Sequence, residues 1–115
     1  MEGTKLAIYI TQARYTHQAI SGLVQNPEDR YEEVRGLFER AGCKLLSYYI
    51  TFGEFDFIIT YEAPNPVAVM AVLATAGAGG GVTDTKTITA VSTAEAKQAF
   101  EMAKASAGKF RSAGT

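Results

Sequence analysis

The amino-acid sequence predicts a single α+β domain built on a four-stranded antiparallel sheet. The chain has 115 residues, of which 47% are hydrophobic and 20% are charged, the composition of one globular domain. Segments with strand and helix periodicity follow the order strand, helix, strand, strand, helix, strand. The two middle strands are nearly continuous, so they form a hairpin. With right-handed crossovers, this order predicts a ferredoxin-like βαββαβ fold, with helices on one sheet face and an extra C-terminal helix.

The first part of the chain contains a strand and the start of a helix. Residues 5–13 (KLAIYITQA) are the first predicted strand, and both of its faces are apolar, as in a strand covered on both sides. Residues 14–25 are irregular, with a short helical turn predicted near Thr16. The first long helix is predicted to begin at Asn26-Pro27, because asparagine caps helices and proline fits the first helical position.

The second and third strands form the predicted hairpin. They are residues 44–52 (KLLSYYITF) and 55–62 (FDFIITYE). Only Gly53 and Glu54 separate them, so we expect a two-residue turn. Every second residue of the third strand is aromatic or aliphatic, and this apolar face is expected to pack on the helices.

A second long helix and a fourth strand complete the predicted fold. The helix begins at Asn65-Pro66 and lacks charged residues in its interior, so it must be covered on most sides. The fourth strand is predicted at residues 82–91. A capping box at residues 92–95 opens the extra C-terminal helix.

Composition limits the class of protein. We expect one domain at residues 1–105 and a flexible tail at residues 106–115. A net charge of −1 and a pI of about 5.8 argue against a nucleic-acid partner. The single cysteine, Cys43, excludes an intrachain disulfide and is typical of a reducing compartment. Neither a secretory leader nor a membrane-length apolar run is evident, so we expect a cytoplasmic protein without a membrane partner.

The second face of the sheet predicts self-association. Two helices cover one face, so the other would expose Ile58, either Tyr48 or Tyr49, and a row of threonines. Exposed apolar patches beyond a few hundred Å² usually mark an interface on soluble proteins. We therefore predict a homodimer or larger homo-oligomer that closes sheet to sheet.

The hairpin carries a family resemblance. The sequence GEFD, followed by an apolar strand and EAPN, resembles the Gly-any-aromatic-Asp signature of the GYD-domain family, here at Gly53, Phe55 and Asp56. Phe55 replaces the more usual tyrosine, and a Gly-Gly-Val sequence replaces Gly-Asn-Val before the last strand. The similarity covers about residues 5–100. It implies a dimeric α+β barrel of the ferredoxin-like group and no established general activity.

Asp56 has two possible roles. It follows the predicted turn and points away from the apolar face of the third strand. In a structural role it would accept backbone N–H groups at the turn or pair with a cation across the oligomer. In a catalytic role it would be a general base in a semi-buried cleft. The structural role is favoured, because structural pairs also perturb carboxylates.

Two further groups of residues are candidates for a ligand site. His17, Arg14 and Tyr15 follow the first strand, where loops often carry function, and His17 is suited to proton transfer near neutrality. A loop histidine with no task is the competing interpretation. Tyr48 and Tyr49 point to opposite sheet faces, as core or interface aromatics or as phenols that hold a ligand oxygen.

Phosphate, metal and cofactor sites are not expected. The glycine-rich residues 76–81 (AGAGGG) leave a helix and enter a strand, whereas phosphate-binding glycines lead into a helix N-terminus. One histidine and one cysteine cannot build a zinc site within one chain.

Three functions remain open. The first is a homo-oligomeric protein that binds a small, largely apolar molecule or serves as an accessory module. The second is a cofactor-independent oxygenase or isomerase, in which His17 or Asp56 moves a proton and Tyr49 orients the substrate. The third is a structural assembly protein. A cleft of roughly 300 Å³ or more that brings together His17, a tyrosine and a carboxylate would favour ligand binding or catalysis. Whether the protein is an enzyme stays open.

Overall fold

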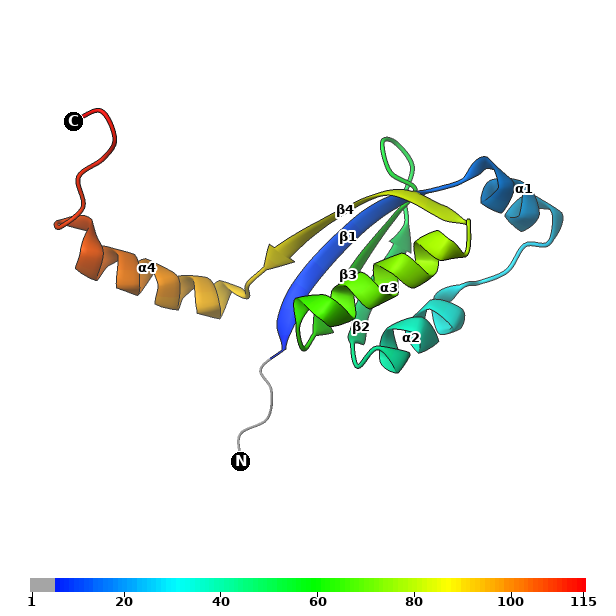
Figure 1. Cartoon of the computed structure of the whole chain (residues 1–115), viewed down its shortest axis with the longest axis horizontal. Coiled ribbons are helices and arrows are strands. Elements are labelled where there is room, and N and C mark those ends of the chain that lie inside the picture. The colour runs from blue at the N-terminus through cyan, green and yellow to red at the C-terminus, as the bar shows by residue number, and fades with distance from the viewer. Residues whose placement is uncertain (1–5) are drawn as a thin grey trace.

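The chain has the predicted α+β, ferredoxin-like architecture (Figure 1). The computed structural model describes residues 6–115, so Lys5, the predicted start of the first strand, lies outside the described residues. In chain order the elements are β1 (Ala7–Tyr15), α1 (His17–Gln25), α2 (Tyr31–Arg40), β2 (Lys44–Ile50), β3 (Phe57–Ala63), α3 (Pro66–Ala78), β4 (Val82–Ala90) and α4 (Thr93–Ala107).

The sheet has the order β2-β3-β1-β4, and all of its neighbouring strands are antiparallel. In the centre, β1 pairs with β3 from Ala7 opposite Ala63 to Ala13 opposite Phe57. On its other side β1 pairs with β4, where Ile8 lies opposite Ala90. The β2–β3 loop therefore lies at the end of the sheet where β1 finishes, and α4 leaves from the opposite end.

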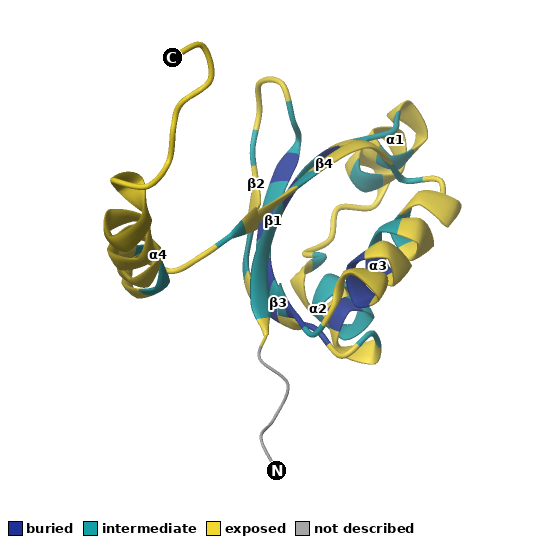
Figure 2. Cartoon of the chain, turned by 60° about the vertical axis from the view of Figure 1, so that its left-hand side comes forward, coloured by how far each residue is buried: buried dark blue, intermediate teal, exposed yellow. Residues whose placement is uncertain are grey.

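The helices α1, α2 and α3 all lie on one face of the sheet (Figure 2). The core between them and the sheet is centred on Tyr61, which is 0% exposed and stacks on Phe38 at a centroid distance of 4.6 Å. The other core side chains come from both central strands, β2, α3 and the α2–β2 junction: Ala13, Cys43, Leu45, Phe57, Ile59, Ala63, Ala68, Val69 and Val72. The buried Cys43 thiol has a pKa raised by desolvation, in keeping with a packing role.

The hairpin is confirmed, but its predicted two-residue turn is wrong. Ile50 lies opposite Phe57, so the loop extends over six positions, from Thr51 to Asp56. Two bonds still cross the loop, because the Thr51 N–H donates to the Asp56 carbonyl and the Thr51 hydroxyl donates to the Phe55 carbonyl. The Asp56 N–H instead donates to the carbonyl of Ala13 in β1. This last bond ties the end of the loop to β1, and the regular β2–β3 ladder ends at the Ile50–Phe57 pair.

The predicted start of the first long helix is also wrong. Asn26 ends α1, because its N–H donates to the Gly22 carbonyl, and α2 begins at Tyr31. The Asp29 carboxylate accepts the Tyr31 N–H at 2.9 Å, so an aspartate instead of Asn26 satisfies a backbone N–H at the start of α2. By contrast, the Asn65 cap of α3 is confirmed, since its side chain accepts the Ala68 N–H at 2.9 Å.

The C-terminal helix α4 stands apart from the rest of the fold. Its predicted capping box is present, with Ser92 and Glu95 bonding to each other's backbone N–H groups. In the described chain it lies beyond the sheet on the side away from α1, α2 and α3 (Figures 1 and 2), and none of its residues is buried. Within residues 6–115, no helix combines the length and apolar character needed to cross a membrane.

Candidate functional site

A cleft of about 540 Å³ lies between the sheet and the three helices that cover it. Its walls are mainly aliphatic and aromatic. The apolar lining comes from α1 (Ala19, Leu23), α2 (Val34, Leu37, Phe38), α3 (Val72, Leu73, Ala76) and the sheet (Phe57, Ile59, Val82). This composition is typical of a site for a small apolar molecule, in which a few polar groups set the orientation.

Two tyrosine hydroxyl groups form the polar feature of this cleft. Tyr15 at the end of β1 and Tyr48 in β2 place their hydroxyl oxygens 2.8 Å apart, in a hydrogen bond. Phe57 of β3 lies against both rings, at centroid distances of 5.2 Å from Tyr15 and 5.9 Å from Tyr48. Neither phenol can turn freely, because each ring packs in the sheet and each hydroxyl bonds the other.

Burial makes ionisation of the Tyr48 phenol still less favourable. Desolvation raises the pKa of Tyr48 far above its ordinary value, and the hydrogen bond with Tyr15 raises it further. Tyr31 at the start of α2 stacks on the Tyr48 ring at 6.3 Å. At neutral pH the pair can therefore give one donor and one acceptor to a ligand oxygen.

Thr11, which lines the cleft, belongs to a second cluster of hydroxyl groups. The Thr11 hydroxyl hydrogen-bonds to the Tyr61 hydroxyl at 2.8 Å and to the Thr87 hydroxyl at 2.8 Å. Burial raises the pKa of Tyr61. Because these bonds link β1, β3 and β4 and hold Tyr61 in the core, we interpret the cluster as structural.

Charged residues surround the entrance. Glu28, Arg30 and Glu33 line the main cleft, and Arg30 pairs with Glu28 at 3.0 Å. An adjoining cleft of about 460 Å³ shares Tyr15, Tyr48 and this ion pair, and its lining also includes Asp56. The charges are exposed at the rim, and the apolar walls lie inside it.

Asp56 holds the hairpin loop to the end of β1. Its carboxylate accepts the backbone N–H of Tyr15 at 2.8 Å, and its own N–H donates to the Ala13 carbonyl at 2.9 Å. The sequence favoured a structural role with N–H groups of the turn, whereas the N–H that the carboxylate accepts belongs to β1. The two Asp56 bonds set the position of Tyr15, so Asp56 acts on the hydroxyl pair through the backbone.

Replacing Asp56 should separate the structural role from a catalytic one. We expect Asp56→Ala to lower the free energy of unfolding by about 1–3 kcal/mol, because the Tyr15 N–H loses its acceptor. Asp56→Asn should retain most of the stability, since the amide oxygen can still accept that hydrogen bond. Urea denaturation measures both. Equal losses in the two variants would contradict this role.

The structure separates the other predicted site residues. His17 is exposed at the start of α1 and is outside the lining of both clefts. Arg14 donates to the Glu54 carbonyl at 2.7 Å and lies over the Phe55 ring, so it packs on the hairpin loop. Tyr49 is 67% exposed on the opposite face of the sheet from Tyr48. Of the predicted residues, Tyr15, Tyr48 and Asp56 come together.

Sequence reasoning missed the helical side of the cleft. Ala19 and Leu23 are four residues apart on α1 and both line the cleft, as do Glu28 and Arg30 in the α1–α2 connection. The four-residue spacing of Ala19 and Leu23 was the available signal for a buried helix face. Among residues 6–115, no group of three or more His, Cys, Asp or Glu side chains is placed to hold a metal ion.

Comparisons with known proteins support a family and a fold. The GYD domain family model matches residues 9–100, which include both tyrosines of the hydroxyl pair. A crystal structure of MtbAldR matches with a TM-score of 0.51 at 10% sequence identity, a likeness of fold. That match covers 75% of this chain and 52% of the other, so the chain spans about half of MtbAldR. No curated protein matches the sequence.

Proposed function

The chain belongs to the GYD domain family, and from this premise we propose that it binds a small, largely apolar molecule carrying one hydroxyl or carbonyl group. The observation behind this proposal is the Tyr15–Tyr48 hydroxyl pair, 2.8 Å apart in a cleft of about 540 Å³ with many aliphatic and aromatic lining residues. The cleft has room for a bicyclic or similar small molecule. The phenols would orient its oxygen, and the aliphatic walls would hold its body.

The positions of the proton-transfer candidates favour binding over catalysis. His17 is outside the cleft lining, and the Asp56 carboxylate accepts a backbone N–H. Of the candidate polar groups, only the Tyr15–Tyr48 pair points to a ligand, and a neutral phenol is well suited to hydrogen-bond recognition. In this proposal Tyr48 is a ligand-binding residue, and Asp56 positions Tyr15.

Binding of two related probes tests the role of the phenols. We expect the chain to bind 2-naphthol more tightly than naphthalene, which lacks the hydroxyl group. Tyr48→Phe should weaken 2-naphthol binding by about 5- to 10-fold, the effect of one neutral hydrogen bond, and leave naphthalene binding unchanged. Fluorescence titration and calorimetry measure both affinities.

Tyr49→Phe is the matched control, because it removes the same atom from the neighbouring residue on the opposite sheet face. It should bind both probes like the unmodified chain. Equal losses for the two probes in Tyr48→Phe would show that the substitution changed the shape of the cleft. Absence of binding by both probes to the unmodified chain would contradict the proposed function.

We further propose that the binding unit is a homodimer closed through the open sheet face. Its support is two apolar pairs on this face, Ile10 opposite Ile88 and Tyr49 opposite Ile58. Directly opposed residues of an antiparallel pair point to the same side, and this side is opposite to α1, α2 and α3. The cleft lies on the helix side, so dimerisation through the open face would leave its entrance accessible.

A further inference from the structure

The chain is more extended than a compact monomer, and α4 with the residues after it projects from the sheet (Figure 1). Its radius of gyration is 18.2 Å and its longest dimension is 60 Å. A compact chain of 115 residues has a radius of gyration of about 13 Å. Figure 1 shows α4 continuing past the end of β4, away from the sheet. A 15-residue helix with no buried residue lacks the packing that normally stabilises helices in proteins.

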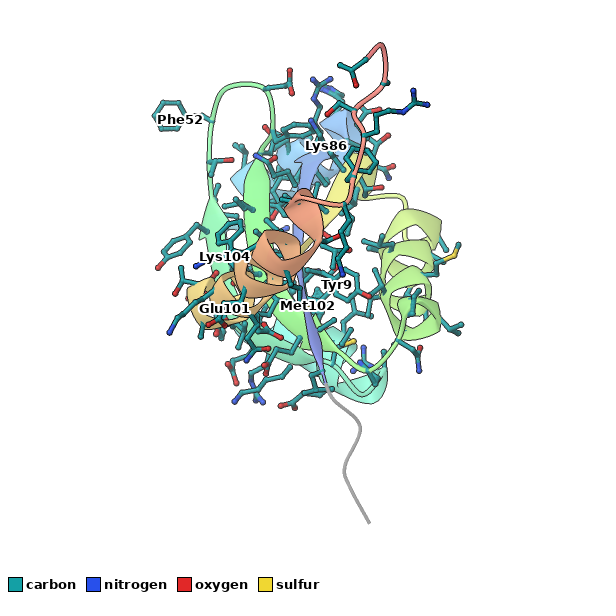
Figure 3. The ribbon with its side chains drawn as sticks, turned by 90° about the vertical axis from the view of Figure 1, so that its left-hand side faces the viewer. Tyr9, Phe52, Lys86, Glu101, Met102 and Lys104 are labelled. Atoms are coloured by element: carbon teal, nitrogen blue, oxygen red, sulfur yellow. The ribbon has the colours of Figure 1, made fainter. Side chains whose placement is uncertain are left out.

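Exposed aromatic side chains occur at both ends of this elongated molecule. Phe100 in α4 is 71% exposed and shares a helical stripe with Ala96, Ala99 and Ala103. Phe52 at the tip of the β2–β3 loop is 100% exposed and extends away from the fold (Figure 3). The two lie at opposite ends of the sheet. The β2–β3 loop lies beside the end of β1, where Asp56 bonds to Ala13. The α4 helix follows Ala90, the β4 residue that pairs with Ile8 near the start of β1.

We propose that α4 packs on a second copy of the chain, with its Phe100 stripe against the partner's open sheet face beside the partner's Phe52 loop. This inference rests on the proposed homodimer and names the segment that completes it. A two-fold axis perpendicular to the strands exchanges the two ends of the sheet. It therefore brings the loop of each copy toward α4 of the other, and the contact forms twice.

The available apolar area fits a second copy as the occupant. Tyr49, Phe52 and Phe100 together expose on the order of 500 Å² per chain, more than half of the roughly 800 Å² per partner in a standard interface. Leu46, Ile88 and Val91 add exposed apolar surface on the same face or its edge. Without a partner, the chain would leave all of this surface in water.

Intermolecular contacts in the full-length protein test the proposal directly. In a sample that mixes isotope-labelled and unlabelled chains, filtered nuclear Overhauser spectra detect contacts between different chains only. We expect contacts from the Phe100 ring to the methyl groups of Ile10, Ile58 or Ile88 of the other copy. Contacts of Phe100 confined to its own chain would overturn the proposal.

Dimer dissociation supplies a second measurement. Light scattering should give twice the chain mass at micromolar concentration. Phe100→Glu and Phe52→Glu should each raise the dimer dissociation constant by about 30-fold or more, as expected for a central aromatic contact. Gln98→Glu is the matched control, because it places the same charge on α4 away from the Phe100 stripe, and it should leave the dissociation constant unchanged.

The outcomes distinguish the separate proposals. A monomer at micromolar concentration overturns both the homodimer and the role of α4. If Phe100→Glu and the unmodified chain form dimers with the same dissociation constant, the role of α4 is overturned and the homodimer stands. Phe100→Glu should keep its affinity for 2-naphthol, because the cleft lies on the other side of the sheet. Loss of that affinity would overturn the separation of cleft and interface.

Discussion

Replacing Tyr61 with alanine is expected to lower the free energy of unfolding by about 3–5 kcal/mol, the range for removing a large buried aromatic ring. Tyr61 is the largest fully buried side chain of the described residues. Its ring stacks with Phe38 and with Tyr9, at centroid distances of 4.6 Å and 5.9 Å. Removing it opens a cavity at the centre of the core and leaves the Thr11 hydroxyl without one of its two partners.

Chemical denaturation followed by circular dichroism measures this loss. Tyr61→Phe is the control that separates packing from hydrogen bonding, since it keeps the ring and removes the hydroxyl. We expect it to cost about 1–2 kcal/mol. A loss in Tyr61→Ala no larger than that in Tyr61→Phe would mean that ring packing contributes little, contrary to the central place of Tyr61.

Filling the cleft is expected to abolish ligand binding without unfolding the protein. Ala76 lies on α3 and lines the cleft, so the indole of Ala76→Trp would occupy space needed by a ligand. We expect 2-naphthol affinity to fall by roughly 100-fold or more, the loss of most of the binding free energy of a small molecule. The free energy of unfolding should change little, because the indole enters an existing space.

Ala74→Trp provides the control for this substitution. Ala74 lies on the same helix two residues earlier, is exposed, and is outside the cleft lining. Its replacement should leave 2-naphthol affinity within about 2-fold of the unmodified chain, which fluorescence titration can resolve. If Ala76→Trp remains folded and binds 2-naphthol normally, the probe occupies another site and the cleft is not its binding site.

Local sequence signals predicted the fold where the deciding interactions are themselves local. Asn65 caps α3 by bonding Ala68 three residues later, and Ser92 caps α4 by bonding Glu95. The same residue type misled at Asn26, because α1 extends far enough to include it as its C-terminal cap. The two-residue turn also failed, because the Asp56 carbonyl accepts the Thr51 N–H while the Asp56 N–H bonds to β1, which leaves a six-position loop.

The candidate site depended on contacts between distant parts of the chain. Tyr15 and Tyr48 are 33 residues apart, and β3 lies between their strands. The sequence indicated that each tyrosine was a candidate, but alternation alone could not show which of Tyr48 and Tyr49 faces the helices. The bulge between Leu45 and Ser47 shifts the register of β2, so the face of each later residue follows from the pairing with β3.

By itself, the sequence determined the order of strands and helices, the starts of α3 and α4, and which two strands form the hairpin. Periodicity and capping act over a few residues, so these features are local. The tertiary structure decided which tyrosines meet, how the hairpin loop closes and where α4 lies. These features depend on strand register, on hydrogen bonds across the sheet and on packing partners, which involve residues tens of positions apart. For this reason the hydroxyl pair and the exposed α4 became visible only in the folded chain.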